Sequence, residues 1–115
     1  MIGVLMEHAI APARLKCILQ ECKRRLAGAV NAKLADIMLF GSYARNEGRG
    51  GSDIDLIMVL NQPLSKAEEE AVSVAVSDIG LANDVLISCL EYPADGFREW
   101  DTPFLMSVRK EGVRI

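Results

Sequence analysis

The chain has 115 residues, of which 50% are hydrophobic and 25% charged, and its formal net charge is −3. This composition is typical of one globular domain spanning residues 1–115, and it excludes disordered and collagen-like chains. The acidic balance argues against direct binding to a nucleic-acid backbone, which requires a basic surface. No run of 18 apolar residues and no basic leader segment occurs, so we expect a cytoplasmic protein that does not enter a membrane.

The first predicted element is an amphipathic helix from Pro12 to Ala27. Its apolar side chains recur at i, i+3, i+4, i+7 and i+11, which is the spacing of one helix face. They are Leu15, Ile18, Leu19, Cys22 and Leu26. Proline suits the first turn of a helix, and Gly28 predicts the end of this one.

Two continuous apolar runs follow and predict buried strands over residues 37–40 and 54–60. The segment 46–52 between them is polar and rich in glycine. A connection of about thirteen residues is compatible with an antiparallel pair or with a tight crossover, and periodicity alone does not decide between them.

A second helix is predicted after Ser65, because Ser65 and Glu68 have the spacing of a capping box. We expect this helix to reach Ile79 and to end at Gly80. Its expected buried face is Ala71, Val72, Ala75 and Ile79, and its expected outer face carries Glu69, Glu70 and Asp78.

The remaining segments complete a small α/β (α+β) domain. We expect a third strand over residues 84–90, a loop over residues 92–100 and a last helix that begins with Thr102 and Pro103. Gly112 is expected to end that helix, and residues 113–115 suit a short edge strand. The order of these elements predicts a small mixed sheet with helices packed on it.

The head of the strand 54–60 carries the first candidate for chemistry. Asp53 and Asp55 are two residues apart, so both side chains project from one face of the strand. The carboxylates repel each other, and this strand has no lysine or arginine to neutralise them. A bound divalent cation would do so, and ligands that are all oxygen favour Mg²⁺ or Mn²⁺ over zinc.

Gly41 and Ser42 form the second candidate, at the end of the strand 37–40. Glycine lets an anion approach the backbone closely, and the amides that follow can donate hydrogen bonds to phosphate oxygens. Phosphate donors beside a pair of carboxylates are what phosphoryl or nucleotidyl transfer requires. If the strand 84–90 lies beside the strand 54–60, Asp84 at its head would add a third carboxylate and complete a two-metal site.

These features stand in a specific order along the chain: an apolar strand, Gly41-Ser42, an Ala-Arg pair, a polar loop, Asp53-Ile54-Asp55, a second strand, a helix, and an Asp opening a third strand. The segment Gly41–Val59 closely resembles the nucleotidyltransferase fold of the DNA polymerase beta superfamily. It is most similar to the small single-domain minimal nucleotidyltransferases (MNT). Residues 104–115 are similar to the last helix and strand of that family, so the resemblance covers about residues 12–115.

The resemblance implies roles for particular residues. It makes Gly41 and Ser42 contacts of the nucleoside triphosphate, and it makes Asp53, Asp55 and Asp84 the catalytic carboxylates and the ligands of two Mg²⁺ ions, with ATP as the substrate. Two further residues bear on the same loop. Arg45 either approaches the phosphates or forms an ion pair that holds the loop 46–52, and Asn46 replaces the glycine that family members usually have there.

The resemblance also implies a function. The protein is expected to be a transferase that moves AMP from ATP to a hydroxyl of an acceptor. Small MNT proteins often pair with a helical HEPN protein in a toxin–antitoxin module, where the MNT antitoxin can adenylylate a tyrosine of the toxin. The chain has no added helical domain for the acceptor, so we expect a protein partner or a second copy of the chain to supply that wall.

The residues 97–103 are the expected contact with that partner, because Phe97, Trp100 and the adjacent Phe104 are aromatic. The alternative function is a catalytically silent subunit that uses the same fold to bind or neutralise its partner. The presence of all three acids and of the Gly-Ser pair favours the enzyme.

Overall fold

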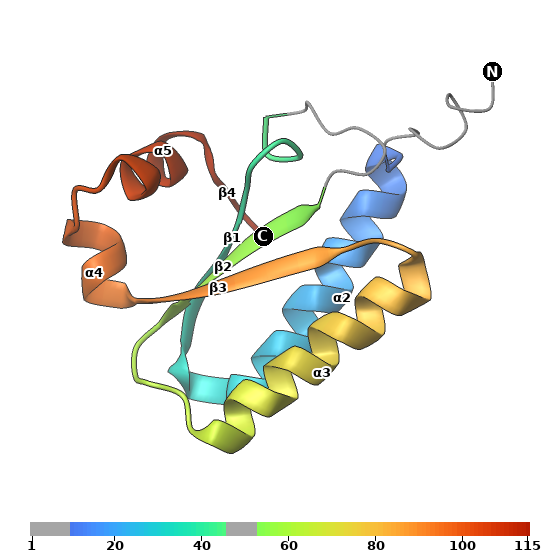
Figure 1. The fold of residues 1–115 in the computed structure, drawn as a ribbon, viewed down its shortest axis with the longest axis horizontal. Helices are drawn as coiled ribbons and strands as arrows, with labels where there is room; N and C mark the ends of the chain where they lie inside the picture. The colour runs from blue at the N-terminus through green and yellow to red at the C-terminus, as the bar shows by residue number, and fades with distance from the viewer. Residues whose placement is uncertain (1–9, 46–52) are drawn as a thin grey trace.

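The computed structural model describes residues 10–45 and 53–115 (Figure 1). The elements in chain order are α2 (Pro12–Val30), the short 3-10 helix η1 (Asn31–Lys33), β1 (Leu34–Phe40), β2 (Ile54–Leu60), α3 (Lys66–Asn83), β3 (Ile87–Pro93), α4 (Ala94–Glu99), α5 (Pro103–Glu111) and β4 (Val113–Arg114). The predicted α/β class is therefore confirmed. No helix of the described segments is long and apolar enough to span a bilayer.

The four strands form one mixed sheet in the order β3-β2-β1-β4. Strand β1 pairs antiparallel with β2 and with β4, whereas β2 and β3 are parallel. The connection between the first two strands, which the sequence left open, is thus antiparallel. The predicted edge strand is confirmed as β4, and β2 has the predicted bounds.

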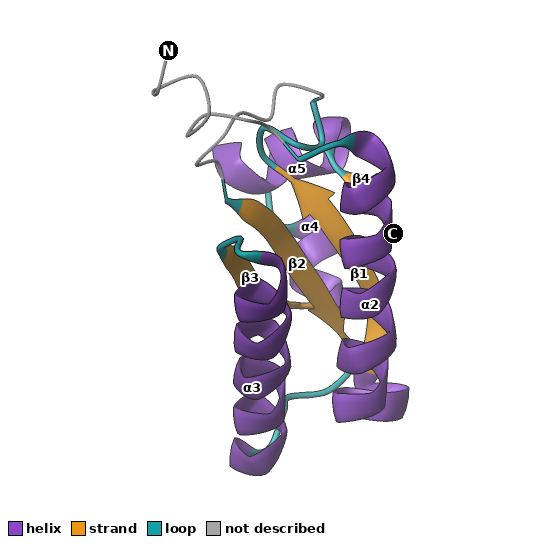
Figure 2. Cartoon of the chain, turned by 90° about the vertical axis from the view of Figure 1, so that its right-hand side faces the viewer, coloured by secondary structure: helices purple, strands orange, loops and turns teal. Residues whose placement is uncertain are grey.

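The sheet separates two layers of helices (Figure 2). Helices α2 and α3 pack together on one face, where Ile54, Leu56 and Met58 of β2 are fully buried in the larger core. The other face carries a smaller core formed by Ile57 and Val59 with α4 and α5. The alternation of β2 side chains between two cores follows from the period of two in a strand.

Helix α2 is longer than its sequence predicts, so the expected end at Gly28 is wrong. A Cβ on Gly28 would meet nothing within 4 Å, and the helix continues to Val30. Val30 is buried and extends the i+4 series of Ile18, Cys22 and Leu26. The burial of one more apolar side chain outweighs the weak helix propensity of glycine.

The capping box of α3 is confirmed, but the predicted end at Gly80 is wrong. The hydroxyl of Ser65 accepts a hydrogen bond from the Glu68 N–H, and the Glu68 carboxylate accepts one from the Ser65 N–H. The helix runs through Gly80 to Asn83, and a Cβ on Gly80 would lie 2.8 Å from the Val85 carbonyl oxygen. Glycine is therefore used here for close packing of the backbone rather than as a stop signal.

Two further expectations about these segments need correction. Ala71 is exposed, although the other three residues of the predicted α3 face are buried. Residues 94–99, expected to lie in a loop, form the six-residue helix α4. A helix of less than two turns is too short to show a periodic apolar pattern. The last helix is confirmed, because the Thr102 hydroxyl accepts the Leu105 N–H and the helix ends at Glu111.

Candidate active site

Asp53 and Asp55 lie at the head of β2, where the side chains of alternate residues project toward the α4 and α5 side of the sheet. Both residues are partly buried. The opposite face of the strand is filled by Ile54 and Leu56 in the larger core. The core therefore fixes the backbone of this strand and holds the two carboxylates on one side.

Electrostatics at this pair disfavour the ionised form of Asp55. Burial raises the pKa of the Asp55 carboxyl above its usual range, and the negative charge of Asp53 raises it further. Among the described residues, no lysine or arginine forms an ion pair with either carboxylate. A cation bound between them would relieve both effects, and the two oxygen donors fit Mg²⁺ or Mn²⁺.

Gly41 stands directly against this pair. It follows β1, whose last residue Phe40 is the register partner of Asp55. Its φ is +77°, and a Cβ there would lie 2.5 Å from the Oδ2 atom of Asp55. Both the backbone conformation and the contact therefore require glycine. The order of the motifs in the sequence suggests that the glycine turn and the carboxylate pair belong together. In the structure, the antiparallel register of β1 and β2 brings them side by side.

Residues 41–45 close into a single turn. The Arg45 N–H donates to the carbonyl oxygens of Gly41 at 3.3 Å and of Ser42 at 3.1 Å. Backbone N–H groups at the start of such a turn are the kind of donor that binds an anion. Ser42 is partly buried and Arg45 is exposed. Asn46 and the rest of the polar loop to Ser52 lie outside the described residues.

Asp84 does not head a strand, so its predicted placement is wrong. It caps the C-terminal end of α3 in the left-handed conformation, with φ 54° and ψ 45°, and its side chain is exposed. Strand β3 begins three residues later, at Ile87. Within the described residues, no group of three or more His, Cys, Asp or Glu side chains is arranged to hold a metal ion.

Ser88 occupies the place beside Asp55 that a third carboxylate would need. The parallel register pairs these two residues directly, and Ser88 is partly buried. Strand alternation puts Asp84, Leu86 and Ser88 on one face of a strand. It cannot show which of the three lies next to the carboxylates, because that depends on the register between β2 and β3.

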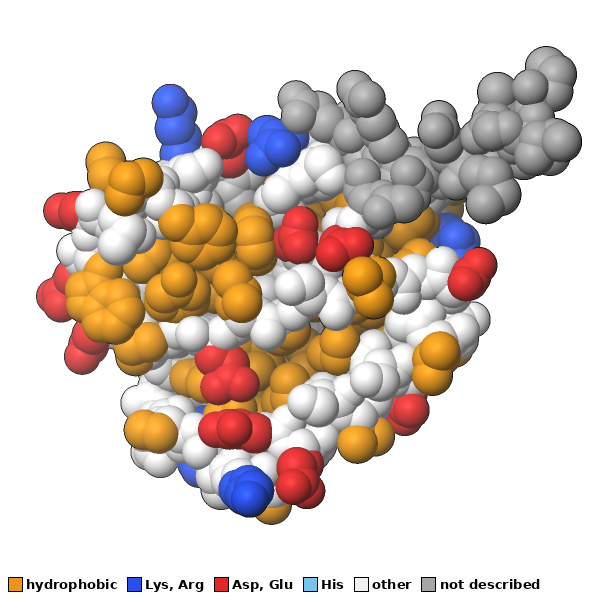
Figure 3. Space-filling view, viewed as in Figure 1, with side chains coloured by type: hydrophobic (Ala, Val, Ile, Leu, Met, Phe, Trp, Pro, Cys, Tyr) orange, Lys and Arg blue, Asp and Glu red, His pale blue; other side chains and the backbone are white. Residues whose placement is uncertain are grey.

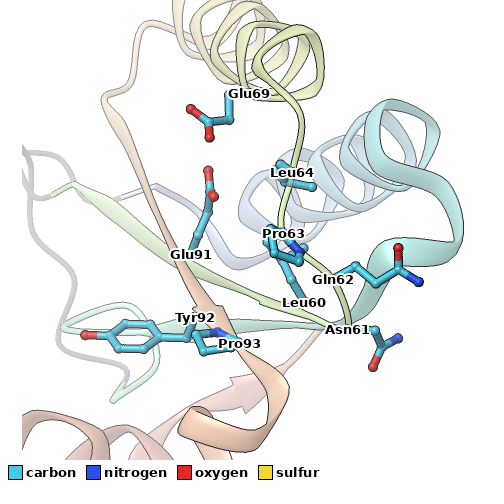
Figure 4. Close-up of a pocket in the computed structure, with 9 residues that line it drawn as sticks. All are labelled: Leu60, Asn61, Gln62, Pro63, Leu64, Glu69, Glu91, Tyr92 and Pro93. Carbon is cyan, nitrogen blue, oxygen red and sulfur yellow. The ribbon is translucent and has the colours of Figure 1, made fainter.

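A separate cavity of about 350 Å³ lies at the opposite end of β2 and β3 (Figure 4). Its walls include Leu60, Pro63 and Leu64, and the carboxylates of Glu69 and Glu91 point toward each other across it. Burial raises the pKa of Glu91, and the charge of Glu69 raises it further. This second carboxylate pair has no glycine turn among the residues that line the cavity.

Aromatic side chains of β1, β3, α5 and the segment before α5 pack together and form an aromatic surface of Phe40, Tyr92, Trp100 and Phe104. Figure 3 shows a hydrophobic patch on this face of the molecule. Phe104 packs edge-on against Phe40, with ring centroids 5.3 Å apart, and stacks on Tyr92 at 6.3 Å. Phe104 is 38% exposed and Trp100 is 50% exposed. Phe97 instead packs against the smaller core.

The segment that carries Trp100 is held in place by Arg109 of α5. Its guanidinium donates to the carbonyl oxygens of Phe97 at 2.6 Å and Trp100 at 2.9 Å, and it forms an ion pair with Asp101 at 3.1 Å. The aromatic surface is thus presented by a segment with a fixed backbone.

Comparison with known proteins identifies relatives of the whole fold. The family described as "Nucleotidyltransferase domain" matches residues 15–95. The chain is 33% identical over 99 residues to "Putative protein adenylyltransferase MJ0141" of Methanocaldococcus jannaschii, an alignment that covers 85% of this chain and 95% of that protein.

Two solved structures share the fold. One is a toxin–antitoxin crystal structure with AMP-PNP, of which the matched chain is 22% identical, with a TM-score of 0.58 over 83% of this chain and 70% of that chain. The other is the tri-AMPylated HEPN toxin of Shewanella oneidensis in complex with an MNT antitoxin. Its matched chain is 20% identical, with a TM-score of 0.51 over 84% of this chain and 70% of that chain.

Proposed function

Because the chain belongs to the nucleotidyltransferase domain family, we propose that it transfers AMP from ATP to a hydroxyl of an acceptor protein, with Mg²⁺ bound by Asp53 and Asp55. The observation that carries the proposal is the contact between Gly41 and the Asp55 carboxylate. It places the turn that can bind phosphate next to the pair that can bind a cation.

In this proposal, one group of residues at this end of the sheet binds the triphosphate and another binds the cation. The turn at Gly41 and Ser42 would bind the triphosphate through backbone N–H groups and one hydroxyl. The carboxylates of Asp53 and Asp55 would hold the cation, which when bound neutralises phosphate charge and stabilises the in-line displacement. Arg45, at the end of the turn, is close enough in sequence to approach the same phosphates.

In the proposed reaction, the acceptor oxygen bonds to the α-phosphorus of ATP. The bond from that phosphorus to the bridging oxygen breaks, pyrophosphate leaves with the electron pair, and the hydroxyl proton passes to solvent water. The described residues contribute position and charge rather than a covalent intermediate, and correct placement of an acceptor lowers the barrier strongly. The expected second Mg²⁺ ion would be held mainly by the triphosphate, because the described residues contain no group of three metal-binding side chains.

The acceptor in this proposal is a tyrosine of a helical HEPN-type toxin, which makes this chain the antitoxin of a toxin–antitoxin module. The sheet, its helices and the triphosphate site use nearly all of the described elements, and in this proposal a second chain encloses the acceptor. The aromatic surface with Trp100 and Phe104 supports this, because exposed aromatic side chains next to a site are typical of interface centres. A second copy of this chain is the other partner that could enclose the acceptor.

The test is co-expression with the product of the adjacent gene, followed by intact-mass measurement of both chains after incubation with ATP and Mg²⁺. The proposal expects one or more adenylyl groups on the partner, and none with the Asp53→Asn/Asp55→Asn variant. The matched control is the Glu69→Gln/Glu91→Gln variant, which removes the same number of carboxylates from the other end of the sheet. It should still transfer adenylyl groups to the partner.

Two other outcomes would change the assignment. A tight complex without any added mass, at every concentration of ATP and Mg²⁺, would favour the silent neutralising subunit. Efficient transfer to a small alcohol by the isolated chain would contradict a protein acceptor while leaving the nucleotidyltransferase chemistry intact.

A further inference from the structure

The structure allows a more specific statement about the cation site, which rests on the proposed function. In a parallel pair, residues in register project from the same face, and neighbouring strands are about 4.8 Å apart. Asp55 is in register with Ser88, and Ile54 is in register with Ile87. The Ser88 hydroxyl therefore stands on the carboxylate face, one strand away from Asp55, and it is partly accessible.

Asp84 cannot take that place without refolding the end of α3. Its N–H bonds to the Leu81 carbonyl oxygen, and the Val85 N–H bonds to the Gly80 carbonyl oxygen at 3.0 Å. These bonds keep Asp84 with the helix, and the first bond to β2 is the one that the Leu86 carbonyl oxygen accepts from the Ile54 N–H at 2.9 Å, directly before β3 begins at Ile87. The side chain is exposed to solvent at the turn between α3 and β3.

We propose that Ser88, and not Asp84, is the third side chain of the Asp53–Asp55 site, so that the site presents two carboxylates and one neutral hydroxyl to the cation. A hydroxyl adds no negative charge, and it can donate a hydrogen bond to a phosphate oxygen or to water on the cation. A carboxylate at the same place would attract a cation more strongly but would repel the triphosphate.

This proposal predicts how cation binding responds to charge at two positions. Affinity for a hard cation rises with the number of charged oxygen ligands. Ser88→Asp should therefore tighten the binding of Mn²⁺ in the absence of nucleotide by about tenfold. Ser88→Asn introduces a side chain of nearly the same shape as aspartate but without its charge, and it should not tighten Mn²⁺ binding. Asp84→Asn should leave Mn²⁺ affinity within about twofold, because that carboxylate is outside the site.

The experiment is a titration of the purified chain with Mn²⁺ in the absence of nucleotide, with free Mn²⁺ measured by electron paramagnetic resonance. Asp53→Asn/Asp55→Asn is included and should abolish binding. If it does not, the proposed cation site and this inference both fail. If it does, but Asp84→Asn weakens binding as strongly or Ser88→Asp gives no gain over Ser88→Asn, only the inference about Ser88 is overturned.

A second substitution covers the case in which Ser88→Asp does not fold. A thiol at position 88 should join the ligands of a soft cation, so Ser88→Cys should give a thiolate-to-Cd²⁺ absorption band that depends on Asp53 and Asp55. Asp84→Cys is the matched control and should give no such band beyond that of the wild-type chain. A band with Asp84→Cys but not with Ser88→Cys would contradict the proposal.

Discussion

The two ends of β2 and β3 each carry a pair of carboxylates, but only one end has the other parts of a site. At both ends burial raises the pKa of one carboxyl, and a neighbouring carboxylate raises it further: Asp55 beside Asp53, and Glu91 beside Glu69. Asp55 also contacts the turn at Gly41, whereas the two glutamates face each other across the separate cavity. A carboxylate pair alone is therefore weak evidence for a function. The groups that surround the pair determine whether it can form a site.

The two carboxylate pairs also differ in how freely their side chains can move apart. Asp53 and Asp55 come from one short stretch of strand, so the backbone fixes their separation. Glu69 and Glu91 come from α3 and β3 and have longer side chains, so they can turn away from each other. The shorter aspartate side chains have less freedom to separate, so a proton or a cation relieves more of the repulsion at the first pair than at the second.

The largest expected difference between the two ends concerns nucleotide binding. Saturation with MgATP at about a hundred times its dissociation constant should raise the free energy of unfolding by about 2.7 kcal/mol. This corresponds to an increase in Tm of roughly 10 °C for a domain of this size. Asp53→Asn/Asp55→Asn should lose most of this increase, and Glu69→Gln/Glu91→Gln should keep it. Thermal denaturation with and without MgATP measures both, and equal losses at the two ends would contradict the assignment.

The next effect concerns the turn that distinguishes the two ends. Gly41→Ala places a Cβ against the Asp55 carboxylate at a φ of +77°, which should lower the free energy of unfolding by about 1–3 kcal/mol. It should also weaken MgATP binding. Gly28→Ala is the matched control, because its Cβ meets nothing and alanine favours a helix, so a gain of about 0.5 kcal/mol is expected. Urea denaturation and calorimetric titration give the two quantities, and a Gly41→Ala chain with wild-type stability would exclude this contact.

A smaller effect concerns pH in the absence of divalent cations. Since the pKa of Asp55 is raised in the folded chain, its contribution to stability is fully present below the unfolded-state pKa of about 3.9 and is lost as the pH rises through the folded pKa. Asp55→Asn should therefore have a higher Tm than the wild type at pH 7 without cations, and the difference should vanish near pH 3. Added Mg²⁺ should stabilise the wild type and not the variant. A lower Tm of the variant at pH 7 would show that Asp55 makes a favourable interaction when ionised.

The smallest effect is expected at the other pair. Glu91→Gln should also raise the Tm slightly at pH 7, because the pKa of Glu91 is raised by burial and by Glu69. The gain should be smaller than that of Asp55→Asn, since the glutamates can move apart, and it should not change when Mg²⁺ is added. A Mg²⁺-dependent gain of stability that requires Glu91 would mean that both ends bind the cation.

Local patterns predicted most of the elements but not the way they meet. The strand β2 was predicted with its observed bounds because its apolar run is continuous. The capping box of α3 and the Thr102 cap of α5 are local signals and were also predicted. The predicted ends at Gly28 and Gly80 were wrong because packing decides where these helices end: α2 continues and buries Val30, and Gly80 allows close approach of the Val85 backbone.

The candidate site shows the same division. Asp53, Asp55 and Gly41 were found from strand alternation and motif order, and the structure brings them together. The third strand was predicted to begin at Asp84 but begins at Ile87, and which of its residues lies beside Asp55 depends on the register of a parallel pair. That register is determined by contacts between residues more than thirty positions apart, which no local pattern contains.

The most direct test of the central claim is to map where a paramagnetic nucleotide complex binds. In an ¹⁵N-labelled chain titrated with MnATP, we expect the amide signals of Gly41, Ser42, Asp55 and Ser88 to broaden first. Those of Leu64, Glu69 and Glu91, at the other end of the sheet, should stay sharp. Broadening centred on the glutamate cavity, or spread equally over both ends, would contradict the assignment of the Asp53–Asp55 end as the nucleotide site.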